Sequence, residues 1–364
     1  MANKLRVGVI GANARVGWAQ RSHLPALAAS ADCELTAVCT TNAEGAEESR
    51  RKFGAKLAFH DYREMVVSPD IDLVAVVVRA PLHYELTKAA LEAGKHVYTE
   101  WPLGRTTAEA QELAALAKSK NVCTVVGLQS RVTPGLVYMK ELMAGGYVGE
   151  VLSCHVSLIR HDPVERPANH TWQRDASLGG NTLTIAAGHT LDSLRFVIAD
   201  YSRIASVMTT QVRQWLDTHT KQMVDVNSPD NVLINAHLSN GAVASAHIAS
   251  VPCAARGYRL EVYGREGALI ATSAGPPQLG DVRVHGARGG RQFELLEAPP
   301  RCCDVPESMP KGAPHAVGQM YFKAAKAIFT GHGDHPTFDT AVELHRIIDT
   351  VRQASATGRE IAVA

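Results

Sequence analysis

The sequence lacks an excess of charge of either sign. Its 364 residues contain 37 Lys and Arg against 36 Asp and Glu, a formal net charge of +1. Proteins that bind nucleic acid over a broad face carry a surplus of Lys and Arg there. We therefore expect no direct nucleic-acid partner, although this balance still allows one local basic pocket for a phosphate.

Long apolar runs are also missing. The longest uninterrupted run covers residues 73–78, whereas a membrane-spanning helix needs ~20 apolar residues. The apolar stretch before Gly11 is about five residues long, too short for a secretory signal peptide. We therefore expect no membrane partner.

At roughly 150 residues per domain, the chain is long enough for two domains.

Paired metal-binding and redox motifs are absent too. The seven cysteines are odd in number and include no C-x-x-C pair, which is typical of core cysteines in a reducing compartment and favours a cytoplasmic protein. The 16 histidines include no H-x-x-x-H or H-E-x-x-H cluster, so we expect no metal site.

The first third of the sequence alternates strand-like and helix-like patterns. The Val-rich run at 73–78 is typical of a strand buried on both faces of a parallel sheet. The other predicted strands are 5–10, 35–39, 96–99 and 122–126, and the predicted helices are 18–30, 43–53, 84–93 and 107–119. This alternation predicts right-handed crossovers and a doubly wound sheet.

After about residue 150 the pattern changes to strands with few helices between them. Strand-like runs cover 151–159, 204–212, 231–238, 242–251, 258–263 and 268–271. Asn240-Gly241 predicts a hairpin, and Gly264–Gly267 predicts another tight turn. We expect a large, mostly antiparallel sheet, an irregular segment at 273–314 and two closing helices at 315–329 and 338–355.

A glycine loop, Gly11-Ala-Asn-Ala-Arg-Val-Gly17, joins the first strand to a helix. Glycine permits the tight turn, and N–H groups at the start of the helix can bind the pyrophosphate of a dinucleotide. The spacing departs from G-x-G-x-x-G, because Asn13 replaces the middle glycine and the last glycine comes one residue late. A turn without a ligand is the alternative, but the surrounding alternation favours a dinucleotide. The candidate cofactor-binding residues of the loop are Gly11, Asn13, Ala14, Arg15 and Val16.

The second predicted strand ends without an acid. A carboxylate there would normally accept the ribose hydroxyls, but this sequence has Thr40-Thr41-Asn42. Small hydroxyls and amides tolerate a 2′-phosphate that an acid would repel. Arg15 could supply charge, as could Arg50, Arg51 and Lys52 unless these three form a solvated helix end. The pattern favours NADP and leaves NAD open, with Thr40 and Thr41 as contacts.

The segment Ala93-Gly-Lys-His-Val-Tyr-Thr-Glu-Trp-Pro-Leu103 resembles the signature of the glucose–fructose oxidoreductase/inositol dehydrogenase/MocA (Gfo/Idh/MocA) family, whose strand ends in Glu-Lys-Pro. Further matches cover nearly the whole chain: Pro81 and His83, Gln129-Ser-Arg131, Gly145–Glu150, Gly179-Gly180, Gly188-His189 with Asp192, and Val262–Gly267. The resemblance implies an α/β fold with an N-terminal Rossmann NAD(P)-binding domain over 1–128. A C-terminal α+β domain over 129–364 would carry a large, mostly antiparallel open sheet for substrate binding and oligomerisation.

The same resemblance implies the functional residues. Cofactor contacts are expected from Arg79, Pro81, His83, Glu100, Trp101, Pro102 and Gln129, and substrate contacts from Trp101, Arg131, Asn181, Thr184, Ile185 and His189. Residues 160–166 and 172–175 are expected at the mouth of the cleft. Arg131 could instead form an interdomain ion pair.

Two residues depart from the family pattern. Trp101 replaces the lysine that commonly positions substrate and assists proton transfer, and Ile185 stands where the family often has aspartate. Tryptophan cannot take up a proton, so Trp101 is either a stacking wall for a ring or a plug in an inactive site. His189 remains, and an imidazole with a pKa of ~6.5 suits proton exchange with a hydroxyl or carbonyl. A structural helix histidine is the alternative.

A narrower resemblance covers five segments: Gly11–Ala19, Glu100-Trp101, Gly127–Arg131, Gly188–Asp192 and His335–Phe338. These look like the subgroup of the fungal galactose-regulon repressor, which binds NAD(P) and acts through a protein partner. We predict an NAD(P)-dependent oxidoreductase for a sugar, polyol or related hydroxyl or carbonyl compound. A catalytically silent NAD(P)-binding sensor or transcriptional co-regulator is the alternative. Because an open sheet needs its outer face covered, we expect a homo-dimer or homo-tetramer through the C-terminal sheet.

Overall fold

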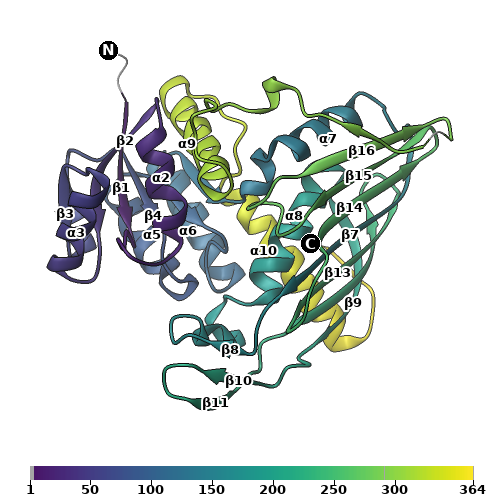
Figure 1. Cartoon of the computed structure of the whole chain (residues 1–364), viewed down its shortest axis with the longest axis horizontal. Helices are drawn as coiled ribbons and strands as arrows, with labels where there is room; N and C mark the ends of the chain where they lie inside the picture. The colour runs from purple at the N-terminus through teal and green to yellow at the C-terminus, as the bar shows by residue number, and fades with distance from the viewer. Residues whose placement is uncertain (1–3, 291, 364) are drawn as a thin grey trace. The chain divides into compact units, whose positions relative to one another are not determined.

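The computed structural model describes residues 4–290 and 292–363, which form two compact units (Figure 1). The first unit consists of two chain segments, the residues up to Gln129 and residues 303–342. The second unit consists of residues 130–302 and the residues from 343 onward. The family resemblance implied a single boundary after residue 128, with residues 129–364 in one domain. It did not include the return of residues 303–342 to the first unit.

A six-stranded parallel sheet forms the centre of the first unit. Its strand order is β3-β2-β1-β4-β5-β6, the dinucleotide-binding order in which the crevice lies at the carboxyl ends of β1 and β4. The strands are β1 (Leu5–Ile10), β2 (Cys33–Cys39), β3 (Leu57–Phe59), β4 (Leu73–Val76), β5 (His96–Glu100) and β6 (Thr124–Gly127). Every residue of β4 is buried, as the Val-rich run predicts.

Helices cover both faces of this sheet (Figure 1). They are α1 (Trp18–Arg21), α2 (His23–Ala29), α3 (Ala43–Phe53), α4 (Tyr62–Val66), α5 (His83–Glu92), α6 (Thr107–Lys120) and α9 (Ala313–Thr330), the last of which packs on α2. The single helix predicted over 18–30 is wrong, because the segment forms α1 and α2. Pro25 cannot donate to the carbonyl of Arg21, so a continuous helix is interrupted between them.

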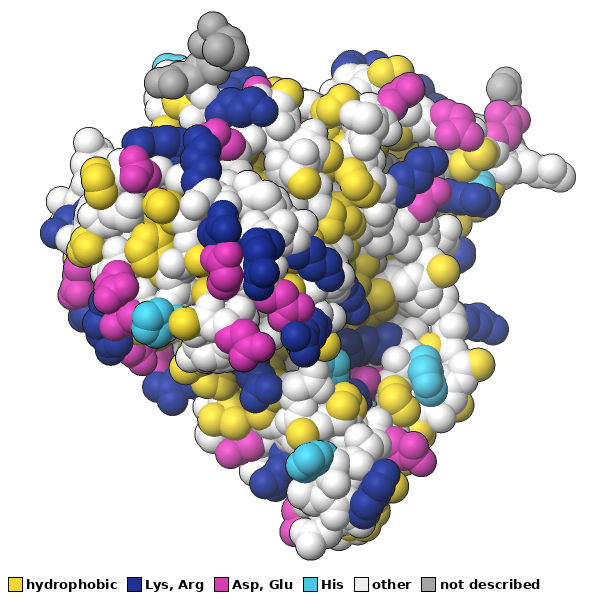
Figure 2. All heavy atoms as spheres, turned by 60° about the vertical axis from the view of Figure 1, so that its left-hand side comes forward, with side chains coloured by type: hydrophobic (Ala, Val, Ile, Leu, Met, Phe, Trp, Pro, Cys, Tyr) yellow, Lys and Arg dark blue, Asp and Glu magenta, His cyan; other side chains and the backbone are white. Residues whose placement is uncertain are grey.

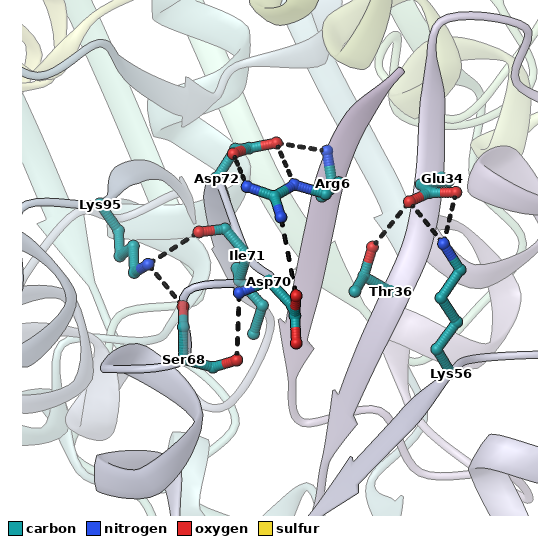
Figure 3. A network of polar contacts seen from close by, with 9 residues as sticks. All are labelled: Arg6, Glu34, Thr36, Lys56, Ser68, Asp70, Ile71, Asp72 and Lys95. Carbon is teal, nitrogen blue, oxygen red and sulfur yellow. Dashed lines mark hydrogen bonds and ion pairs between the residues drawn. The ribbon is translucent and has the colours of Figure 1, made fainter. Parts of the chain in front are cut away.

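Polar contacts tie the sheet together at the amino ends of its strands, opposite the glycine loop (Figure 3). Arg6 on β1 donates from Nε and Nη2 to the carboxylate of Asp72 over 3.0 and 2.6 Å. The Lys95 Nζ donates to the carbonyls of Ser68 and Ile71 over 2.7 and 2.8 Å. These contacts fix the registry of β1, β4 and β5 away from the carboxyl edge.

The second unit contains a nine-stranded sheet with the order β17-β16-β15-β14-β7-β13-β12-β9-β18. Its strands are β7 (Val151–His161), β9 (Tyr201–Thr209), β12 (Asn231–Leu238), β13 (Val243–Val251), β14 (Gly257–Gly264), β15 (Gly267–Ser273), β16 (Arg283–Arg288), β17 (Glu294–Leu296) and β18 (Ile361–Ala362). Neighbouring strands are antiparallel except β7 and β13. The predicted large, mostly antiparallel sheet and both predicted turns are confirmed.

The rest of the second unit lies around this sheet. A small sheet of β11 (Gln222–Asp225), β10 (Gln214–Asp217) and β8 (Glu165–Arg166) accompanies the helices α7 (Pro134–Ala144) and α8 (Gly188–Val197). The helix α10 (Phe338–Thr357) begins in the first unit and continues into the second. The prediction of an irregular segment at 273–314 is wrong in part, because β16 and β17 lie there. The Gly- and Arg-containing sequence of β16 hid a short alternation in which Val284 and Gly286 are buried, and β17 is only three residues long.

Two observations concern the surface. Over the face in view, Figure 2 shows Lys and Arg side chains interspersed with Asp and Glu, in keeping with the net charge of +1. Within residues 4–290 and 292–363, no helix combines the length and apolarity that crossing a bilayer requires.

Candidate functional site

The glycine loop leaves β1 through a backbone conformation that requires glycine. Gly11 has φ +90°, and a Cβ added there would lie 2.2 Å from the carbonyl oxygen of Val77, the residue directly after β4. No side chain fits this position without moving the sheet. The loop is therefore pressed against the carboxyl ends of β1 and β4, where a dinucleotide pyrophosphate binds in this fold.

Asn13 organises the part of the loop that lacks the middle glycine. Its Oδ1 accepts hydrogen bonds from the backbone N–H groups of Arg15 and Val16, over 2.8 and 3.1 Å. A phosphate that used these two donors would have to replace Oδ1. The Asn13 side chain thus holds the loop in the shape that a phosphate would otherwise impose.

Helix α3 is attached to the same loop by three side chains. Ser49 donates to the carbonyl of Ala12, Lys52 Nζ donates to the carbonyl of Ala14 over 2.6 Å, and Glu48 pairs with Arg15 at 2.9 Å. Lys52 and Arg15 therefore bring two cations to the loop. Arg50, by contrast, pairs with Glu47 along the helix.

The end of β2 is also fixed by local bonds. Thr40 donates from Oγ1 to the carbonyl of Asn42 over 2.9 Å, and Asn42 caps α3 by accepting from the N–H of Gly45 over 2.7 Å. Thr41 is exposed. These side chains are short and uncharged and Arg15 lies in the glycine loop, so the residues of this edge are chemically compatible with an NAD(P) adenosine.

Glu100 lies in a buried network rather than at the surface of the carboxyl edge. Its carboxylate accepts from Nε2 of Gln129 at 2.9 Å and is bonded to Nε2 of His23 at 2.8 Å. His23 Nδ1 lies 2.7 Å from the hydroxyl of Tyr321, and Gln129 also donates to Tyr98. Burial raises the pKa values of both tyrosines, which stay neutral. Glu100 and Gln129, predicted as cofactor contacts, are bonded to each other here.

His83 holds the turn that follows β5. Its Nδ1 lies 2.6 Å from the carbonyl oxygen of Pro102, which follows Trp101 through a cis peptide bond. Burial lowers the pKa of His83 and outweighs the bonds to backbone carbonyls that raise it, so the ring is neutral. Trp101 is buried, whereas Arg79 is exposed and Pro81 half-buried at the turn before α5.

In the second unit, four predicted substrate residues lie on one helical segment. A π-helix, η5 (Thr182–Ala187), runs directly into α8. Asn181 caps it by accepting from the N–H groups of Leu183 and Thr184, while Thr184 Oγ1 accepts from the N–H of Asn181 over 2.9 Å. Ile185 is half-buried and His189 buried. π-helical turns are rare and concentrate at functional sites, so this segment is a strong candidate site.

Arg131 was expected to contact substrate or to form an interdomain ion pair. Its Nε and Nη2 instead donate to both oxygens of Asp192 over 2.9 and 2.7 Å, within the second unit. The side chain of Asp192 is fully buried, three residues beyond His189 on α8. Arg131 therefore anchors the helix that carries His189. His161 bonds the carbonyl of Cys253.

The structure brings the loop residues, Thr40 and Thr41 to one edge of the first unit, and the residues 181–189 to one helix of the second. Sequence reasoning missed His23, whose partner Glu100 is 77 positions away. It also missed the direct contact of Lys52 with the loop carbonyl. The only signal for these was the position of each residue next to a recognised motif.

Two family models match the chain. Residues 5–128 match an oxidoreductase family with an NAD-binding Rossmann fold, and residues 134–273 match the C-terminal domain of Gal80p. The chain thus resembles the Gfo/Idh/MocA family over its Rossmann domain and Gal80p over the following domain. The predicted Rossmann fold and its larger α/β partner are confirmed by these matches.

The proteins to which this chain is similar include enzymes and regulators. An uncharacterized oxidoreductase of Synechocystis is 26% identical over 99% of this chain and 96% of its own length. Levoglucosan dehydrogenase of Pseudarthrobacter phenanthrenivorans is 27% identical over 64% of this chain and 63% of its own. The galactose/lactose metabolism regulatory protein GAL80 of Saccharomyces cerevisiae is 28% identical over 66% of this chain and 60% of its own length. The matched region thus spans less than two thirds of the levoglucosan dehydrogenase and of GAL80.

Solved structures show the same fold. Levoglucosan dehydrogenase in complex with NADH and levoglucosan superposes with a TM-score of 0.86, at 24% identity over 99% of this chain and 100% of that one. A super-repressor mutant of Gal80p from Saccharomyces cerevisiae superposes with a TM-score of 0.87, at 21% identity over 99% of this chain and 98% of that one. The fold is therefore shared by a sugar dehydrogenase and by a regulator.

Proposed function

We propose that this protein is an NAD(P)-dependent oxidoreductase that acts on a sugar, polyol or related hydroxyl or carbonyl compound. The observation that carries the proposal is His189, a buried imidazole at the junction of a π-helix and α8, on a helix anchored by Arg131 and Asp192. The sugar-dehydrogenase relatives of the family support it.

Each residue has a part in this proposal. The loop 11–16 would hold the pyrophosphate, and Thr40, Thr41 and Arg15 the adenosine ribose; the bound NAD(P) supplies the hydride acceptor or donor. His189 takes the proton from the substrate hydroxyl, or returns it to the carbonyl, directly or through a water. Trp101 would offer an apolar ring surface to the nicotinamide. His83, Glu100 and Gln129 position the turn that carries Trp101.

We also infer a preference for NADP. An acid that would repel a 2′-phosphate is absent from residues 40–42, and Arg15 lies at the loop with a side chain 74% exposed. Its ion pair with Glu48 is a surface pair of low strength, so a phosphate can compete for the guanidinium.

The test is turnover with both cofactors. Wild type and His189→Ala are first titrated with NADH and NADPH by nicotinamide fluorescence, and then assayed against a panel of sugars, polyols and carbonyl compounds. We expect both proteins to bind the cofactor and only the wild type to turn over a substrate rapidly, with a loss of about 10²–10⁴-fold in the variant. Equal turnover by the two proteins would refute the role of His189.

A second candidate function is a catalytically silent NAD(P)-binding regulator. Trp101 in place of the family lysine and the match of residues 134–273 to the Gal80p C-terminal domain favour it. It predicts tight cofactor binding, no hydride transfer with any panel compound and a protein partner in pull-downs. Enzyme-like turnover of one compound would eliminate it.

We further propose that the protein forms a homo-oligomer through the large sheet. Val207 on β9 and Leu233 on β12 are direct cross-strand neighbours, and their side chains are 58% and 44% exposed. Exposed apolar neighbours on an open sheet favour a second copy as the covering partner. Light scattering of Leu233→Lys should report a smaller assembly than that of the wild type; an unchanged mass would argue against this face.

A further inference from the structure

A small polar cavity lies within the second unit, beside the π-helix. Its volume is about 40 Å³, enough for a carboxylate-sized group or a few waters. Arg160 at the end of β7, Arg166 on β8 and Trp215 on β10 contribute to its wall, and Asn181 and Ile185 contribute from the start of the π-helix. These elements are all in one compact unit.

Arg166 is the most unusual residue of this wall. It is only 6% exposed, its guanidinium stacks on the Trp215 ring at 4.3 Å, and its Nη1 donates to Asp162. Its Nε is buried and has no partner among the residues that the structure describes. In guanidinium groups, Nε and Nη2 form the edge that binds a carboxylate through two parallel bonds. A buried donor left without an acceptor is costly, which favours a ligand that supplies one.

The charges around the cavity leave this edge available. Arg160 donates to Asp162 over 2.8 Å and to Ser250 over 2.9 Å. Burial raises the pKa of Asp162, but the two arginines lower it further, so Asp162 is ionised and balances one of two positive charges.

The second acid of the wall is occupied elsewhere. Asp230 accepts from the backbone N–H groups of Gln211 and Val212 and from the amide of Asn231, over 2.7 to 3.0 Å. Three hydrogen-bond donors therefore stabilise the Asp230 carboxylate. Among the described residues, Arg166 forms its ion pair with Asp162 and none with Asp230. The unsatisfied group is a donor, and a matching ligand must bring acceptor oxygens.

We propose that this cavity binds a carboxylate of the substrate, which makes the substrate class an acidic sugar or related polyhydroxy acid. The inference rests on the proposed oxidoreductase function. Ile185 lines the cavity and His189 follows four residues later on the same continuous helical segment, about 6 Å along its axis. The cavity thus lies beside the helical segment that carries the imidazole.

The experiment compares acids with their neutral counterparts. The NADP⁺-loaded full chain is titrated by calorimetry with D-glucuronate and D-glucose, D-galacturonate and D-galactose, and D-gluconate and D-glucitol. We expect at least one acid to bind about ten-fold or more tightly than its neutral partner. No preference for any acid would overturn the proposal and leave the cavity to solvent.

Variants locate the effect. Ile185→Asp places a competing carboxylate at the cavity wall, and Ile185→Asn provides the same shape without the charge. The acid should bind Ile185→Asn about ten-fold more tightly than Ile185→Asp; equal affinities would refute the site. Arg166→Lys removes the planar edge and should abolish the preference for acids over neutral sugars. If Arg166→Lys does not fold, the comparison of Ile185→Asp with Ile185→Asn still tests the site.

Turnover of the same compounds separates the two proposals. An acid that binds selectively but leaves the nicotinamide absorbance unchanged supports the cavity and contradicts the oxidoreductase. Rapid turnover of neutral sugars without any preference for acids supports the oxidoreductase and contradicts the cavity.

Discussion

Gly127→Ala should destabilise the first unit through Glu100. A Cβ on Gly127, the last residue of β6, would lie 2.6 Å from Oε2 and 2.9 Å from Oε1 of Glu100, well inside the ordinary contact range of 3.4–4 Å. The carboxylate cannot withdraw without lengthening its bonds to His23 and Gln129. Each hydrogen bond to a charged group contributes about 1.5–3 kcal/mol, so we expect the free energy of unfolding to fall by about 2–4 kcal/mol.

Equilibrium urea unfolding measures this cost, and tryptophan fluorescence reports on Trp101 beside the network. Gly275→Ala is the matched control, because a Cβ there meets no described atom within 4 Å and the backbone is not left-handed; its effect should stay within about 0.5 kcal/mol. In a Glu100→Ala background the cost of Gly127→Ala should largely disappear. A cost no larger than that of Gly275→Ala, or one that persists without Glu100, would refute the reasoning.

Three further predictions concern the helix anchor, a buried histidine and cofactor choice. Asp192→Asn leaves Arg131 without its buried carboxylate and should lower the free energy of unfolding in urea by about 3 kcal/mol; a change below about 1 kcal/mol would contradict the anchor. The pKa of His83 lies below its ordinary value of 6.5, so below pH 6.5 the unfolded chain binds more protons than the folded one. Stability should fall as the pH drops below about 6.5, and less steeply in His83→Gln; identical slopes would exclude His83 as a cause. Arg15→Ala should weaken NADPH binding about five-fold while changing NADH binding little, and Thr41→Asp should reverse the preference; parallel changes for both cofactors would contradict the 2′-phosphate site.

The regular elements of the first unit could be predicted because their signals are local. The strand at 5–10 and the helix at 43–53 match β1 and α3, and the Val-rich run marks β4. Local pattern failed where one residue overrides it, as at Pro25 in α2, which interrupts the helix after Arg21. It also failed for β3 and α4, which are three and five residues long and too short for a periodicity to be recognised.

The candidate site could be predicted only as a set of positions. The motifs predict Glu100 and Gln129 as cofactor contacts and Arg131 as a substrate contact, but the partners of these side chains are set by tertiary contacts. His23 reaches Glu100 across 77 positions, and Asp192 reaches Arg131 across 61. An arginine guanidinium can bind a carboxylate of a substrate or a carboxylate of the protein itself. Sequence alone therefore left the role of Arg131 open.

The most direct test of the central claim is a single-turnover measurement. The protein, in excess over NADPH, is mixed rapidly with each sugar, uronate and carbonyl compound while the absorbance of the reduced nicotinamide is followed. We predict that at least one compound removes this absorbance completely in the wild type and that His189→Ala slows the loss by about 10²-fold or more. No loss of absorbance from NADPH with any carbonyl compound, together with no gain of absorbance from NADP⁺ with any hydroxyl compound, would contradict the oxidoreductase.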